Sequence, residues 1–307
     1  MRSRPFALAD LDAVVALIGR GELGEDVELD GKSRSTVASA LGPPLVDPDR
    51  DVRLWCGDDG ALRGFAWIRV EAVGAEVHGR LHYVIGASHD LSLEPEIVGW
   101  AGDRLAEDAT GARRLVHPVA IRDLPRAARL ARLGFVIYRS RVCMERTTAA
   151  PIPDLPLPPG YRMRASRGVA DIDAYAAAFN QAFADSHDFS PLTVAELVHD
   201  MTQATYRPDR DLIVEDGGGA MVGFCYVTDD AAAPSQAYIG TVAVVRSHRG
   251  LGLGGALIAA ALHALRADGV TDVQLHVDTD SPTGALRLYQ RLGFTIRNAE
   301  VRYARSP

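Results

Sequence analysis

The sequence predicts an α/β protein made of two domains in tandem, each a mixed and mostly antiparallel sheet flanked by helices. A chain of 307 residues is longer than a usual single domain and can supply two hydrophobic cores. A proline-rich stretch at residues 151–159 is typical of an extended linker between domains. We therefore expect a first domain at residues 1–147, a linker at 148–160 and a second domain at 161–307.

An internal repeat supports the division into two domains. Two glycine-phenylalanine dipeptides of the first half recur in the second half at one common separation, which we call the repeat interval. The dipeptide at 64–65 recurs at 223–224, and the dipeptide at 134–135 recurs at 293–294. A separation that stays constant from the first dipeptide to the second is rare by chance and indicates a duplication.

The two halves are predicted to run through the same order of elements. Runs of β-branched and aromatic residues predict strands, and apolar residues spaced by three and four predict helices. In the first half we expect a strand at 4–5, a helix at 10–18, a hairpin from 52–56 and 62–70, a strand at 81–85, a helix at 97–107 and a strand at 134–138. In the second half we expect a strand at 161–164, a helix at 171–183 and a hairpin from 212–215 and 221–227.

A glycine-rich corner at residues 241–255 joins a β-branched strand to a strong helix former at 256–262. Glycines allow the main chain to approach a ligand, so that successive N–H groups can converge on one anion at a helix N-terminus. A pyrophosphate suits this corner, and Arg249 would add a charge-assisted contact. The corner lacks the Gly-Lys-Ser/Thr of a P-loop, and it lies too late in the chain for a dinucleotide-binding fingerprint.

The pattern Arg249-x-x-Gly252-x-Gly254 after the strand 242–244 resembles the acetyl-CoA loop of the GNAT acyltransferase superfamily. Downstream, Ala285-x-x-x-Tyr289 followed by a Gly-Phe dipeptide resembles the closing helix and strand entry of that family. The resemblance implies acetyl-CoA as co-substrate and transfer of the acetyl group to an amine in the second domain. It implies these cofactor contacts: Val242, Ala243, Val244, Arg249, Gly250, Leu251, Gly252, Leu253, Gly254 and Gly255.

Two catalytic residues are expected in the same domain. Tyr289 matches the position of the general acid that protonates the sulfur of CoA, although its spacing also suits a packed helix stripe. His276 is a candidate base, because alternation along 273–278 places it with Asp278 on the polar face of a strand. Many members of the family use a carboxylate or a water chain instead, and Asp278 is the second candidate.

The resemblance places acceptor recognition in the connection at residues 183–190. Asp185, His187 and Asp188 could bind a small-molecule amine there, although a loop of this composition is often only solvated. The acceptor and the acyl-chain length are not specified by the sequence.

The first copy is expected to have lost the cofactor loop. The repeat interval places Asp90, Leu93 and Pro95 where the second copy has Arg249, Gly252 and Gly254, and it places Leu130 at the position of Tyr289. A carboxylate without glycines would repel a phosphate. The first copy is therefore predicted to stabilise the second or to shape its acceptor site.

Composition excludes several classes of function. A net charge of −7 argues against nucleic-acid binding, and no apolar run is long enough to span a membrane, so we expect a cytoplasmic protein. Three scattered cysteines predict neither disulfides nor a metal site. The helically spaced Arg122, Arg126, Arg129 and Arg132 are expected to form a solvated or salt-bridged face. Nothing in the sequence specifies the oligomeric state.

A tandem chain in which only the second copy is intact resembles the mycothiol synthase group of bacterial acetyltransferases. The departure is at two strand positions, where that group has Glu and Tyr and this chain has Tyr238 and His276. The leading hypothesis is therefore an acetyltransferase that acts on some other small-molecule amine, and mycothiol synthesis is a second hypothesis. A protein that binds acyl-CoA without turnover, as a sensor, is a third.

Overall fold

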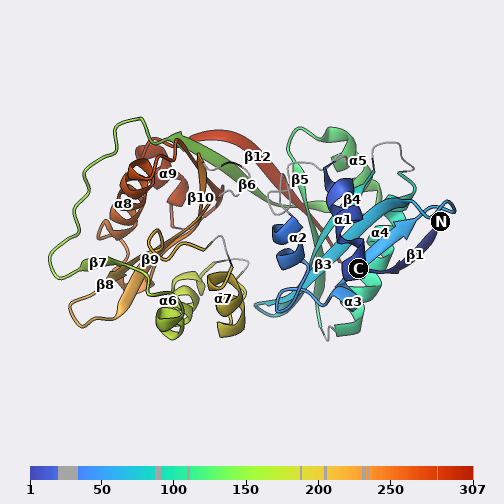
Figure 1. Ribbon diagram of the computed structural model, residues 1–307, viewed down its shortest axis with the longest axis horizontal. Coiled ribbons are helices and arrows are strands. Elements are labelled where there is room, and N and C mark those ends of the chain that lie inside the picture. The colour runs from blue at the N-terminus through green and yellow to red at the C-terminus, as the bar shows by residue number, and fades with distance from the viewer. Residues whose placement is uncertain are drawn as a thin grey trace. The chain divides into compact units, whose positions relative to one another are not determined.

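The computed structural model describes residues 1–19, 34–86, 91–108, 111–186, 189–203, 206–229, 233, 235–281 and 283–306. The chain divides into two compact units (Figure 1). Unit 1 comprises Met1–Ser140 and Glu300–Pro307, and unit 2 comprises Arg141–Ala299. Among the described residues, no helix is long and apolar enough to cross a membrane.

Unit 1 is a mixed sheet between two helical layers. Its strand order is β1-β2-β3-β4-β5-β12, and all neighbours pair antiparallel except the parallel pair β4–β5. The strands are β1 (Arg2–Pro5), β2 (Val52–Cys56), β3 (Leu62–Val73), β4 (Glu76–Ile85), β5 (Arg113–Ala120) and the end of β12 (Thr295–Arg305). The helices are η1 (Leu8–Asp10), α1 (Leu11–Ile18), α2 (Arg34–Ala40), α3 (Pro48–Asp51), α4 (Leu93–Asp108) and α5 (Leu124–Arg132). α1 and α2 bury Leu11 and Val37 in one core, whereas α4 and α5 bury Ile97 and Leu130 in another.

Unit 2 repeats this architecture with the strand order β6-β11-β10-β9-β8-β7. The strands are β6 (Val136–Thr147), β7 (Arg162–Ala165), β8 (Leu212–Glu215), β9 (Met221–Asp229), β10 (Gln236–Val244) and β11 (Asp272–Asp278). The helices are η2 (Gly168–Asp171), α6 (Ile172–Phe183), α7 (Val194–Met201), η3 (Arg246–His248), α8 (Leu253–Ala267) and α9 (Ala285–Arg291). α8 and α9 pack on one face of the sheet, and α6 and α7 contribute to a separate core that includes Ile213 and Phe224.

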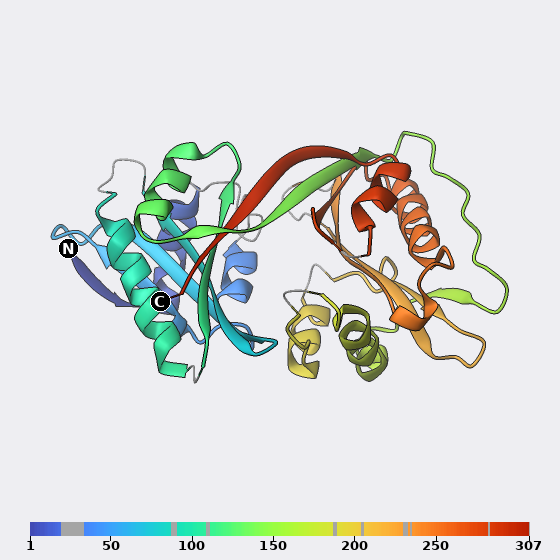
Figure 2. The ribbon, with the colours of Figure 1, turned by 180° about the vertical axis from the view of Figure 1, so that it is seen from behind.

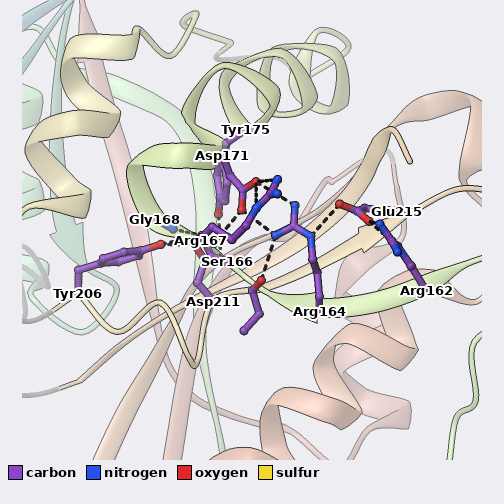
Figure 3. A network of polar contacts seen from close by, with 11 residues as sticks. Arg162, Arg164, Ser166, Arg167, Gly168, Asp171, Tyr175, Tyr206, Asp211 and Glu215 are labelled. Carbon is purple, nitrogen blue, oxygen red and sulfur yellow. Dashed lines mark hydrogen bonds and ion pairs between the residues drawn. The ribbon is translucent and has the colours of Figure 1, made fainter. Parts of the chain in front are cut away.

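The structure confirms the internal repeat. β9, β11 and β12 each begin one repeat interval after β3, β5 and β6, respectively. An arginine–aspartate pair also closes the start of each unit. Arg4 donates through both terminal nitrogens to Asp10 at 2.7 Å, and Arg164 makes the same fork to Asp171 at 2.7 and 2.9 Å (Figure 3).

The last strand of each half completes the sheet of the other unit. Residues Arg141 to Thr147 of β6 pair with β11 of unit 2, and residues Glu300 to Arg305 of β12 pair with β5 of unit 1. Arg305 fixes this end by donating from Nη1 to the carbonyl of Leu133 at 3.0 Å. From sequence we expected each continuous half of the chain to form its own domain. The pairing of a strand with a distant segment leaves no local pattern in the sequence from which an exchange could be predicted.

The proline-rich linker has no helix or strand between Pro151 and Pro158. It runs as an extended trace past α8 (Figure 2). Arg266 Nη2 of α8 donates to the carbonyl of Ala150 at 2.8 Å, and Ile152 and Leu157 pack against the core of unit 2. The linker therefore forms part of unit 2.

Candidate functional site

The glycine corner forms the turn between β10 and α8. Gly250 and Gly252 have φ of +80° and +84°, a region that residues with a Cβ rarely adopt, and Gly252 is the N-cap of α8. The first backbone bond into the helix runs from the Ala256 amide to the Gly252 carbonyl at 3.0 Å. The preceding amides, those of residues 253–255, therefore have no acceptor within the helix. They give the corner the donors and the dipole that an anion needs.

β10 presents an open edge of peptide groups that leads to this corner. Among the described residues, its parallel ladder with β11 covers Gln236 to Ile239, and a bulge at Gly240 follows. The Val245 amide donates to the Val222 carbonyl of β9 at 2.9 Å. Because antiparallel pairs alternate, the peptide groups of Val242 and Val244 point to the opposite edge, away from β9. An extended ligand can pair with this edge as a further strand does.

Arg249 and Asp185, expected to contact different substrates, bind each other. Arg249 Nη1 and Nη2 lie 2.7 and 3.0 Å from the two carboxylate oxygens of Asp185, just after α6. Arg249 also donates from Nε to the Val244 carbonyl at 3.2 Å and from Nη2 to the Ala182 carbonyl. Its hydrogen bonds hold the pKa of Asp185 below the usual range. The pair ties the corner to the end of α6 and partly neutralises the charge of Arg249.

Tyr289 lies on α9 with its side chain almost fully buried. Its ring packs edge-on against Phe294, with centroids 6.0 Å apart, and it belongs to the core of unit 2. Burial raises the pKa of the phenol, so the proton stays on the oxygen at neutral pH. Tyr289 is thus packed in the core, as its helical spacing predicts, and its hydroxyl is protonated, as a general acid requires.

His276 lies on β11 and contacts Tyr238 on β10. The Tyr238 hydroxyl is 2.7 Å from His276 Nδ1. Asp278 ends the same strand, and its carbonyl accepts from the Ser281 amide at 3.2 Å. His187 and Asp188, the other expected acceptor contacts, lie outside the described residues. The contact between Tyr238 and His276 was missed from sequence because it depends on the register of two strands that are distant along the chain.

Unit 1 has a buried carboxylate in the first turn of α4, which corresponds to α8. Glu94 is 2% exposed and accepts from the Tyr83 hydroxyl at 2.6 Å and from Arg129 Nε at 2.7 Å. The guanidinium of Arg126, 5% exposed, lies 4.5 Å from the centre of the Tyr83 ring. The arginines of α5, expected to form a solvated or salt-bridged face, are therefore partly buried inside unit 1. Leu130 is fully buried at the position of Tyr289, and Asp90 lies outside the described residues.

Comparisons with known proteins identify the family of the chain. The Acetyltransferase (GNAT) family is matched over residues 174–294. A mycothiol acetyltransferase from Thermobispora bispora is 38% identical over 60% of this chain, which spans 63% of that relative. One from Frankia casuarinae is 34% identical over 96% of this chain and 94% of its own length, and one from Frankia alni is 30% identical over 97% and 92%. The chain belongs to the GNAT acetyltransferase family.

Solved structures share the tandem fold. A GCN5-related N-acetyltransferase from Sphaerobacter thermophilus superposes with a TM-score of 0.75 at 22% identity, over 99% of this chain and 95% of the other. A tandem GNAT protein from the clavulanic acid biosynthesis pathway gives 0.74 at 17% identity, over 99% and 98%. A Saccharomyces cerevisiae N-myristoyltransferase with bound myristoyl-CoA gives 0.68 at 12% identity, over 99% and 78%. The chain is therefore a tandem member of its family.

Proposed function

We propose that unit 2 is an acetyl-CoA-dependent N-acetyltransferase that acts on a small-molecule amine by direct transfer. The observation that carries this proposal is the continuity of the open β10 edge with the glycine corner. The peptide groups of Val242 and the amide of Val244, whose carbonyl already accepts from Arg249, would bind the pantetheine arm, and the amides at the start of α8 would bind the pyrophosphate. Both features come from one short segment, 242–255, in the half of the chain that matches the family.

The residues around this segment fit the chemistry of acyl transfer. Bound acetyl-CoA supplies an activated acetyl thioester. Tyr289, whose pKa is raised by burial, holds a proton that the leaving sulfur requires. The amine attacks the thioester directly, so that no serine or cysteine nucleophile is needed. Cys225 is fully buried on β9, and burial raises the pKa of its thiol, which makes it unsuited to nucleophilic attack.

The first acceptor to test is the unacetylated precursor of mycothiol. Relatives named mycothiol acetyltransferases match nearly the full chain, which supports this choice. The pair Tyr238 and His276, in place of the Glu and Tyr of that group, supports a different amine. The two possibilities share the donor and the mechanism and differ only in the acceptor.

Turnover with a panel of amines tests the proposal. Purified protein is incubated with acetyl-CoA and each amine, the mycothiol precursor included, and the acetylated amine is measured by mass spectrometry. We expect product with at least one amine and none when acetyl-CoA is omitted. Tight binding of acetyl-CoA without product across a broad panel would instead identify an acyl-CoA sensor. Absence of acetyl-CoA binding would overturn the proposal as a whole.

A further inference from the structure

Tyr238 and His276 meet where β10 and β11 part. The last parallel pair is Ile239 with Leu275, so Tyr238 lies just before the point of parting and His276 just after it. The open edge of β10, at Val242 and Val244, follows directly after the bulge at Gly240. The pair therefore lies beside the segment proposed to hold the thioester.

Both side chains lie on the face of the sheet opposite the α8 core. Ala237 and Ile239 on β10, and Leu275 and Val277 on β11, belong to that core, so the alternating residues between them face the other way. Tyr238 and His276 are each half-buried. Their rings pack at a centroid distance of 5.5 Å, and the hydroxyl lies 2.7 Å from Nδ1. A hydrogen bond of this length on a partly accessible face can exchange protons with a bound substrate.

Unit 1 shows what the same position does without a cofactor corner. The repeat interval places Gly79 at Tyr238 and His117 at His276, and the strand registers agree, because Gly79 pairs with Leu115 as Tyr238 pairs with Gln274. His117 is 1% exposed, and its Nδ1 lies 2.8 Å from the backbone carbonyl of Leu81. The imidazole is kept in both units, but only unit 2 presents its Nδ1 to a hydroxyl on a half-buried face.

We propose that Tyr238 and His276 form a two-step proton relay for the acceptor amine, with Tyr238 as the group that touches the amine. This inference rests on the proposed acetyl transfer. As the amine nitrogen forms its bond to the thioester carbon, the nitrogen loses a proton to Tyr238 Oη, and Tyr238 passes its own proton to His276 Nδ1. The C–S bond breaks with its electron pair on sulfur, which takes the proton of Tyr289. His276 then releases its extra proton to solvent and Tyr289 takes one up, so that net one proton leaves the amine and one is gained by the thiol.

The order of the relay follows from acidity and access. A neutral imidazole, with a reference pKa near 6.5, accepts a proton near neutral pH, whereas a neutral phenol can take a proton only as it gives up its own. Nδ1 is already hydrogen-bonded to the hydroxyl, so a proton reaches it through Tyr238.

Other titratable groups share this face of unit 2 with the pair. They include Arg141, Cys143 and Glu145 on β6, Asp272 and Asp278 on β11, Tyr226 on β9, Tyr175 on α6, Tyr206, and the carboxylates of Asp200 and Asp211, whose charges act on Tyr226. All of them remain unchanged in the variants below, so a pH effect confined to those variants reports on the pair itself.

A double-mutant cycle tests the relay. We compare wild type, Tyr238→Phe, His276→Gln and the double variant, using acetyl-CoA and the best amine of the panel. The relay predicts that each variant lowers kcat by about 10²-fold, that the double variant is no worse than either single one, and that acetyl-CoA affinity is unchanged. The wild-type rate should fall as acid protonates His276, and this acid limb should vanish in Tyr238→Phe. Tyr303→Phe and His263→Gln, outside the site, serve as matched controls.

Three results would overturn the relay. A wild-type rate in Tyr238→Phe with a loss only in His276→Gln would make His276 the direct base. Multiplying losses in the double variant would make the two residues independent. Wild-type rates in both single variants would give the pair no part in transfer.

An NMR measurement separates failure of the relay from failure of the proposed function. ¹⁵N spectra of the acetyl-CoA-bound protein report which imidazole nitrogen carries the proton, and the His276 signal is assigned by its loss in His276→Gln. The relay predicts a neutral ring protonated at Nε2, with Nδ1 accepting from Tyr238. A ring protonated at Nδ1 would overturn the relay even if transfer occurs. A wild-type protein that acetylates no amine would overturn the proposed function and, with it, the relay.

Discussion

The starts of α4 and α8 occupy equivalent positions in the two copies of the fold. They differ in their residues: the start of α8 has glycines, and the start of α4 has a buried carboxylate. At α8, glycines occupy positions 252 and 254, and the amides of residues 253–255 have no acceptor within the helix. At α4, Leu93 and Pro95 take those positions, and the intervening Glu94 is a buried carboxylate held by Arg129 and Tyr83. We propose that these few residues at the helix start decide whether a copy of this fold binds a diphosphate.

The same contrast extends to the closing helix of each copy. α9 carries a buried tyrosine with a protonated hydroxyl, and α5 carries Leu130 in its place. Among the described residues, unit 1 thus has neither glycines at the start of α4 nor a tyrosine at the position of Tyr289. In unit 1, Leu130 serves packing and Glu94 forms an internal ion pair, whereas the loss of cofactor binding by this unit stays a prediction.

Replacing Tyr289 by Phe removes the hydroxyl group, which Leu130 at the equivalent position of unit 1 also lacks. We expect kcat to fall by about 10²-fold or more, because the leaving sulfur loses its proton donor. Acetyl-CoA affinity and the melting temperature should change little, because the ring that packs against Phe294 is kept. Steady-state kinetics and calorimetry measure the two effects. A full rate in this variant would mean that the acid lies elsewhere.

Replacing Glu94 by Ala should affect stability and leave the cofactor site unchanged. Glu94 is nearly inaccessible and Arg129 partly exposed, so we expect a loss of about 2–3 kcal/mol in the free energy of unfolding. Glu107→Ala on the same helix is the matched control, since the Glu107 carboxylate is exposed and its pairs with Arg50 and, at 3.8 Å, with Arg104 should contribute less than about 1 kcal/mol. Urea denaturation distinguishes them. A weaker affinity for acetyl-CoA in Glu94→Ala would show that unit 1 takes part in binding.

Asp211 marks a third difference, since unit 1 has the buried Val52 at that position. Burial raises the pKa of Asp211 to about 7, against hydrogen bonds from Tyr206 at 2.9 Å and Tyr175 at 3.3 Å (Figure 3). Between an unfolded pKa near 3.8 and about 7, the folded state keeps a proton that the unfolded state releases. This contribution to stability is therefore fully present at low pH and is lost as the pH rises towards 7.

Asp211→Asn should remove this dependence on pH. Relative to the variant, the wild type should lose stability by about 1 kcal/mol per pH unit between pH 5 and pH 7, and the difference should level off above that range. Urea midpoints at pH 5, 6, 7 and 8 measure it. A difference that stays constant over this range would mean that Asp211 is ionised throughout.

Gly252→Val tests the backbone of the corner directly. A β-branched residue at φ of +84° is strained by about 1–2 kcal/mol, so we expect the corner to shift and acetyl-CoA to bind about tenfold more weakly. Gly219→Val is the matched control, because Gly219 has φ of +83° in the turn between β8 and β9 of the same unit. The control should lose similar stability and no affinity. Equal affinities in the two variants would remove the corner from the binding site.

Local features of the site could be predicted from sequence. Positive φ at Gly252 and a helix at 256–262 follow from glycine and from helix propensity, which act over a few residues. The repeat and both hairpins were likewise visible, because an interval and an alternation are properties of the sequence itself.

Contacts between distant segments could not be predicted. Arg249 and Asp185 are far apart along the chain and meet only once α6 is placed against the corner. The pair Tyr238 and His276 depends on a parallel register. The exchange of β6 and β12 between the units depends on the sheet edge with which each strand pairs. The sequence of neither strand indicates which strand it pairs with.

Titration calorimetry of the wild-type protein with coenzyme A tests the difference between the two helix starts most directly. We expect one binding site per chain, because the start of α8 has the glycine corner and the start of α4 has the buried Glu94. Two sites per chain would mean that α4 also binds the cofactor despite Glu94, and no binding would mean that neither helix start is an anion site.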